Sequence, residues 1–109
     1  EPTEGVAVFG LVVKFVLKDE ASAQGFDALV AETLAKIRQS EPGTLVYAVH
    51  EVDGEPLHRV FYELYADRAA FEAHEEQPHV RRFLQERGQY LESFSVDFLS
   101  LRDAKGVTK

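Results

Sequence analysis

The segment that most constrains the fold is Val6–Leu17, in which every residue except Gly10 and Lys14 is apolar. Its many β-branched and aromatic residues are typical of a β-strand. Because neighbouring side chains of a strand point to opposite faces, both faces of this strand are apolar. The segment Leu45–Val49 has the same property. A sheet built around these strands must therefore be covered on both sides.

Hydrophobic spacing and turn residues predict the remaining elements. Ser22 is the predicted N-cap of a first helix, and Pro42 with Gly43 ends it. Asp67 caps a second helical piece, and Pro78 lies in the first turn of a third. The predicted order is a strand over 6–17, a helix over 22–39, strands over 44–52 and 57–66 joined by a hairpin turn over 53–55, helical pieces over 67–76 and 78–88, and a strand over 92–101.

This β-α-β-β-α-β order is typical of the ferredoxin-like α+β fold, a four-stranded antiparallel sheet with the helices on one face. The 109 residues form a single domain, 1–109, with a core at about 6–101 and a short flexible head and tail. Helices can cover only one face of the sheet, whereas a solvent-exposed antiparallel face is normally polar. We therefore expect a second copy of the chain to cover the other face, which gives a homodimeric α/β barrel.

Composition argues against several classes of function. Cysteine is absent, which removes thiolate nucleophiles and cysteine-based metal sites. The formal net charge is −7 and no stripe of Lys or Arg offsets it, so no nucleic-acid partner is expected. No apolar run reaches the roughly eighteen residues that a membrane span needs, and no segment has the pattern of a secretion signal. We therefore expect a cytoplasmic protein with no membrane partner.

Three segments together resemble the antibiotic biosynthesis monooxygenase domain. They are Glu41–Tyr47, Phe61–Tyr65 and Phe71–Phe83. The family shows a Pro-Gly or Gly before the second strand, a Glu followed two residues later by an aromatic on the third strand, and a helix with the pattern Ala-His…Pro-His…Phe. The resemblance covers roughly Val6 to Leu101.

The resemblance implies a chemistry without a cofactor. Family members include enzymes that oxidise phenols or quinols with molecular oxygen alone, enzymes that degrade haem, and isomerases of signal molecules. The haem-degrading relatives use an Asn, a Trp and a His together, and this chain has no Asn and no Trp. We therefore expect a cofactor-independent monooxygenase acting on a small hydroxylated aromatic. The alternative is a non-oxidative small-molecule isomerase or a ligand-binding dimer of the same fold.

His79 and His74 are the predicted catalytic residues, one of them as the base that accepts a phenolic proton. We favour His79, because it follows Pro78 in the first turn of a helix, where the neutral imidazole is preferred over the imidazolium. The alternative for either histidine is a structural role. Their separation of five residues does not match the zinc motif HExxH, so no metal is expected.

Five further residues are predicted to bind the substrate. Glu63 lies in an otherwise apolar strand, so its carboxylate must be paired, hydrogen-bonded or near solvent. Tyr65 lies where many family members have a Trp that lines the cavity. The alternatives are that Glu63 pairs with an Arg or a Tyr hydroxyl and that Tyr65 packs in the core. Arg81 and Arg82 could reach an anionic substrate. The predicted substrate-binding residues are Tyr65, Glu63, Tyr47, Phe83 and Phe71.

Overall fold

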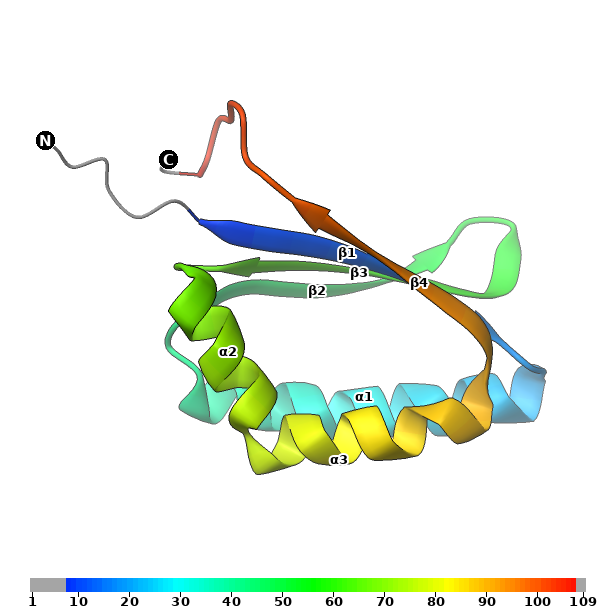
Figure 1. The fold of residues 1–109 in the computed structure, drawn as a ribbon. Helices are drawn as coiled ribbons and strands as arrows, with labels where there is room; N and C mark the ends of the chain where they lie inside the picture. Colours follow the sequence, from blue (N-terminus) through cyan, green and yellow to red (C-terminus); the bar gives the residue numbers. More distant parts are fainter. Residues whose placement is uncertain (1–7, 108–109) are drawn as a thin grey trace, which may run out of the picture.

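The computed structural model describes residues 8–107, whose arrangement is shown in Figure 1. The predicted strand start at Val6, the predicted head over 1–5 and the last residues of the predicted tail, 108–109, lie outside these residues. Along the chain the elements are β1 (Phe9–Leu17), α1 (Glu20–Ser40), β2 (Thr44–Val52), β3 (Glu55–Tyr65), α2 (Arg68–Glu76), α3 (Pro78–Glu86), the 3-10 helix η1 (Arg87–Tyr90) and β4 (Leu91–Leu99).

The four strands form one antiparallel sheet in the order β2-β3-β1-β4. The helices all lie on the same face of this sheet, with α1 and α3 next to each other and α2 crossing one end (Figure 1). The predicted ferredoxin-like α+β fold is therefore confirmed. No helix formed by residues 8–107 lies on the other face of the sheet.

Several predicted element ends are wrong by a few residues. The N-cap of α1 is Asp19 rather than Ser22, because the Asp19 carboxylate accepts the backbone N–H of Ser22 at 2.7 Å. The turn is shorter than predicted, since Gly54 with a φ of +81° reverses the chain and β3 already begins at Glu55. After α3 the chain tightens into η1, so the last strand runs over Leu91–Leu99 rather than 92–101. The predicted cap at Asp67 is confirmed.

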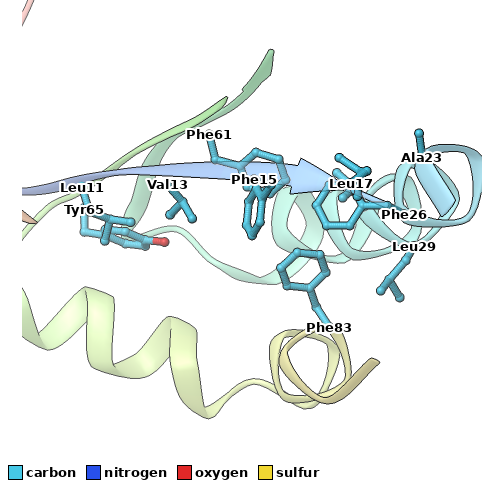
Figure 2. Packing of buried hydrophobic residues seen from close by; sticks show 11 residues of the cluster. Leu11, Val13, Phe15, Leu17, Ala23, Phe26, Leu29, Phe61, Tyr65 and Phe83 are labelled. Carbon is cyan, nitrogen blue, oxygen red and sulfur yellow. The ribbon is translucent and has the colours of Figure 1, made fainter. Parts of the chain in front are cut away.

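An aromatic cluster joins the sheet to α1 and α3. Phe15 of β1 packs against Phe26 of α1 and Phe61 of β3, with ring centroids 5.1 and 4.7 Å apart. Phe83 of α3 lies 5.9 Å from Phe26 and completes the cluster, which Figure 2 shows from close by. Buried phenyl rings contribute large apolar areas, so this cluster fixes the helical layer at one end of the sheet.

The connection between α1 and β2 lies very close to α2. A Cβ placed on Gly43 would lie 2.7 Å from the Cβ of Ala70, which is shorter than real carbon–carbon contacts. The Gly43 carbonyl also accepts the backbone N–H of Ala66 at 2.9 Å, which holds the connection against the end of β3. Glycine at this position therefore allows α2 to approach the C-terminal end of α1.

We expect Gly43→Ala to destabilise the protein by about 1–3 kcal/mol, the usual cost of forcing an extra methyl group into a packed contact. Urea denaturation would measure this change. Gly88→Ala is the matched control, because a Cβ at Gly88 meets nothing within 4 Å. Equal stabilities of the two variants would show that the contact between Gly43 and Ala70 does not limit packing.

Candidate active site

A pocket with a volume of about 110 Å³ lies between the sheet and the helical layer. Most of its lining is apolar and aromatic, and the polar exceptions come from β2, β3, α2 and η1. Such a lining suits a flat apolar molecule, while the few polar groups can orient it. The lining residues are Leu11, Val13, Phe15, Tyr47, Phe61, Glu63, Phe71, His74, Glu75, Val80, Phe83, Leu84, Arg87, Val96 and Phe98.

His74 is held in the pocket wall by a buried carboxylate. Its Nδ1 lies 2.6 Å from Oε1 of Glu41, the residue that caps the C-terminus of α1. The imidazole ring packs between Tyr47 and Tyr65, with ring centroids 5.6 and 5.1 Å away. Among residues 8–107 no buried side-chain nitrogen or oxygen lacks a hydrogen bond. The hydrogen bond to Glu41 engages Nδ1 of His74 and leaves Nε2 without a bond within the same range, and the His74 side chain lines the pocket.

Glu41 binds a second imidazole with its other oxygen. Nε2 of His79 donates to Oε2 at 2.5 Å, and the hydroxyl of Thr44 donates to Oε1 at 2.7 Å. Burial raises the pKa of the Glu41 carboxyl, but the hydrogen bonds from His74, Thr44 and His79 outweigh this effect and lower it below the usual value. Glu41 is therefore a carboxylate that keeps both histidines in place.

The structure places the two predicted histidines differently. His79, which the sequence analysis favours as the base, does not line the pocket and faces α1 beside Glu32, Thr33 and Lys36. His74 lines the pocket. The break at Pro78 turns the imidazole of His79 back toward Glu41, so its position after the proline does not bring it to the cavity.

Glu63 is paired within its own strand. Its Oε1 accepts the hydroxyl of Tyr65 at 2.6 Å, and both side chains point toward the helical layer. Burial raises the pKa of Glu63 to about 7, although the hydrogen bond from Tyr65 acts in the opposite direction. Glu63 can therefore exchange a proton with a ligand near neutral pH.

Of the predicted substrate-binding residues, Glu63, Tyr47, Phe71 and Phe83 line the pocket. Tyr65 does not line it, because its side chain is fully buried behind Glu63 and packs on His74. Tyr65 therefore contacts the pocket only through Glu63, whose carboxyl lines it, and substrate binding by Tyr65 stays a prediction.

Arg87 is a site residue that the sequence analysis missed. It begins η1, and its guanidinium lies 4.6 Å from the centroid of Phe94 and 5.7 Å from those of Phe15 and Phe83. Burial lowers its pKa, and the fields of Tyr47 and Glu63 oppose that effect. In the sequence Arg87 stands before Gly88 at a predicted helix end, a place where an arginine normally faces water, so no pattern pointed to it.

The two arginines that the sequence did single out lie on the surface. Arg81 pairs with Glu76, and Arg82 pairs with Glu32 and Glu86. Neither lines the pocket. Over residues 8–107 no three His, Asp or Glu side chains are grouped so that they could hold a metal ion. In the same range, none of the helices combines the length and apolar character that crossing a membrane requires.

The fold and the pocket define a class of protein: a ferredoxin-like α+β domain that encloses an aromatic-lined site with a buried histidine between its sheet and its helices. The family model described as antibiotic biosynthesis monooxygenase matches residues 9–86. The chain therefore belongs to the antibiotic biosynthesis monooxygenase family. A comparison with curated proteins gives no significant match.

Solved structures share the fold over nearly the whole chain. A proposed antibiotic biosynthesis monooxygenase from Caulobacter crescentus is 22% identical with a TM-score of 0.82, and the match covers 90% of this chain and 92% of that one. Rv0793 from Mycobacterium tuberculosis is 21% identical with a TM-score of 0.81, covering 90% and 98%. A proposed monooxygenase of the same kind from Bacteroides thetaiotaomicron is 19% identical with a TM-score of 0.79, covering 94% and 96%. At these identities the similarity shows a common fold.

Glu63 predicts a pH-dependent contribution to stability. Between about pH 4.5 and 7 the folded protein keeps a proton on Glu63 that the unfolded chain releases, so the free energy of unfolding falls as pH rises through this interval. The shift from 4.5 to about 7 corresponds to roughly 3 kcal/mol. Glu63→Gln still accepts the Tyr65 hydroxyl but cannot ionise. Relative to the unsubstituted protein, its free energy of unfolding should rise by an amount of this order from about pH 5 to about pH 8.

Urea denaturation at several pH values would make this measurement. Glu72→Gln serves as the control, because Glu72 is an exposed glutamate on α2. A difference between Glu63→Gln and the unsubstituted protein that does not change with pH would contradict the expected effect.

Proposed function

We propose that the protein is a monooxygenase that oxidises a hydroxylated aromatic, a quinol or a polyketide-like phenol, with molecular oxygen and without a metal or organic cofactor of its own. The observation that carries this proposal is the orientation of His74. Its Nδ1 is bound by Glu41, and its Nε2 is available to a ligand in an aromatic-lined pocket. Membership of the antibiotic biosynthesis monooxygenase family supports the same reaction class.

His74 is suited to act as a general base. The bond to Glu41 favours the tautomer with its proton on Nδ1, which leaves the lone pair of Nε2 free to accept a proton. A phenolic hydroxyl within hydrogen-bond reach of Nε2 can then be deprotonated. The imidazolium that forms is stabilised by the buried Glu41 carboxylate, in the same way that a buried Asp supports the histidine of a catalytic triad.

In this reaction the substrate itself reduces oxygen. Deprotonation makes the ring electron-rich enough to pass electrons to O2. For a hydroquinone, one oxygen atom of O2 enters a ring C–H bond and the two original hydroxyls become carbonyls. The second oxygen atom leaves as water with the two hydrogens that the substrate loses. The chain contributes by holding the ring against its aromatic lining and by moving the proton at His74 Nε2.

Glu63 supports a second candidate function, a non-oxidative isomerisation. Its carboxyl lines the same pocket as His74, and burial raises its pKa to about 7. One group can therefore remove a proton while the other returns one to a different atom of the ligand. Oxygen uptake with a panel of hydroquinones and anthrone-like compounds separates the two functions, because isomerisation consumes no oxygen.

Replacement of His74 should affect turnover directly. We expect His74→Gln to lower kcat/KM for an accepted quinol by about 10² to 10⁴, the usual contribution of general-base catalysis. His79→Gln leaves Nε2 of His74 in place and should lower kcat/KM for the same quinol by less than about tenfold. Oxygen-electrode kinetics would measure both variants. Glu72→Gln, at an exposed position of α2, is the control, and full activity of His74→Gln would exclude His74 as the base.

We also propose that the functional form is a homodimer through the face of the sheet that carries no helix. On this face the side chains of β1, β2 and β3 are mostly apolar and, in the single chain, mostly half-buried. An antiparallel sheet face of this kind is normally polar when water covers it. The apolar residues concerned are Val12, Val16, Val46, Ala48, Val60, Tyr62 and Leu64.

Light scattering at micromolar concentration should give about twice the chain mass, and a specific interface should bury on the order of 1,600 Å². Val12→Asp introduces a charge at the centre of this face and should give monomers. Ala31→Asp, at an exposed position of α1, should leave the mass unchanged. A stable monomer in the unsubstituted protein would overturn the proposal.

A further inference from the structure

Arg87 presents unused hydrogen-bond donors to the pocket. Its guanidinium contacts three phenyl rings, and within residues 8–107 it forms no hydrogen bond and no ion pair. No buried nitrogen in this part of the chain is unpaired, so the guanidinium nitrogens are accessible where Arg87 lines the pocket. A guanidinium has five N–H donors in a fixed plane, a geometry that fits a carboxylate or an ionised hydroxyl.

A structural role alone does not account for this arrangement. The chain has 19 acidic residues, and Arg59, Arg68, Arg81 and Arg82 each form an ion pair with at least one of them, while the exposed Arg38 forms none within residues 8–107. Arg87 remains unpaired, although two carboxyl-bearing residues of the same pocket lining are near enough to act on its pKa. Cation–π contacts hold the guanidinium plane and leave its edge available.

Arg87 and His74 contact different rings of the pocket lining. His74 packs against Tyr47, whose ring centroid is 5.8 Å from that of Phe61. Phe61 stacks on Phe83 at 6.2 Å, and the Arg87 guanidinium lies 5.7 Å from Phe83. A continuous row of aromatic rings therefore runs from the imidazole to the guanidinium, and the two polar groups share no ring partner.

We infer that Arg87 binds an anionic oxygen group on the substrate, and that the substrate is a fused aromatic carrying this group at one end and a hydroxyl for His74 at the other. The inference rests on the proposed function, because it assigns a substrate class to the same pocket. The fused rings of the substrate pack against Tyr47, Phe61 and Phe83, between His74 and Arg87. Arg87 is the one permanent cation among the lining residues, so it selects the anionic end.

The test is a binding measurement that needs no turnover. The probes are 6-hydroxy-2-naphthoate, its neutral analogue 6-hydroxy-2-naphthamide, and 2,6-dihydroxynaphthalene, each titrated into the full chain and followed by naphthol fluorescence. We expect the naphthoate to bind at least about tenfold more tightly than the amide. Binding of the dihydroxynaphthalene that tightens as its hydroxyl ionises would identify an ionised hydroxyl as a second source of the anion.

Substitution of Arg87 should remove this preference. In Arg87→Gln the naphthoate should bind about tenfold to a hundredfold more weakly, whereas the amide should change little. Arg82→Gln is the matched control, because Arg82 is an exposed arginine of α3 that does not line the pocket. Thermal melting of each variant would confirm that it is folded. If Arg87→Gln does not fold, Arg87→Lys, which keeps the charge and loses the planar fork, should still weaken naphthoate binding.

Three results would overturn the inference: equal binding of naphthoate and amide, a preference that survives in Arg87→Gln, or no binding of the naphthoate at millimolar concentration. These results are separate from the fate of the proposed function. Selective naphthoate binding without oxygen uptake on any quinol would support the anion site at Arg87 and contradict the proposed monooxygenase function. Oxygen uptake on neutral quinols without selective naphthoate binding would support the monooxygenase function and contradict the anion site.

Discussion

The rest of the site depends on the Glu41 carboxylate. It lies at the C-terminus of α1, where the helix dipole disfavours a negative charge, and its side chain is almost fully buried. Burying an unpaired carboxylate would cost several kcal/mol, so the three hydrogen bonds that it accepts offset this cost in the folded protein. Two of the donors are His74 on α2 and His79 on α3. The Glu41 carboxylate at the end of α1 is therefore hydrogen-bonded to both α2 and α3.

This shared carboxylate also separates the roles of the two histidines. His74 donates to the carboxylate through Nδ1 and His79 donates through Nε2, so the two imidazole rings contact Glu41 with different nitrogens. His74 lines the pocket, whereas His79 does not. The pairing of a buried charge thus orients the imidazole that lines the pocket.

Most of the fold could be predicted from the sequence, because apolar alternation and cap residues are local signals. Asp67 and Pro78 mark helix starts in the sequence and in the structure, and the β-branched and aromatic residues of β1 predicted a strand there. The site could be predicted only in part. His74, Glu63 and Tyr47 lie in recognisable segments, but the contact between Glu41 and His74 joins positions 33 residues apart. Arg87 is defined entirely by the rings around it, which come from three separate elements.

Tyr65 affects the chemistry of the pocket wall through Glu63. The phenol of Tyr65 donates a short hydrogen bond to the Glu63 carboxyl, which lines the pocket. That bond favours the charged form of Glu63, while burial favours the neutral form, and the two effects leave its pKa at about 7. The pKa of the Glu41 carboxyl, which contacts His74, is thus lowered, whereas that of Glu63 in the pocket wall is raised to about 7. Carboxyls whose surroundings separate their pKa values in this way are the pattern from which acid–base roles are assigned.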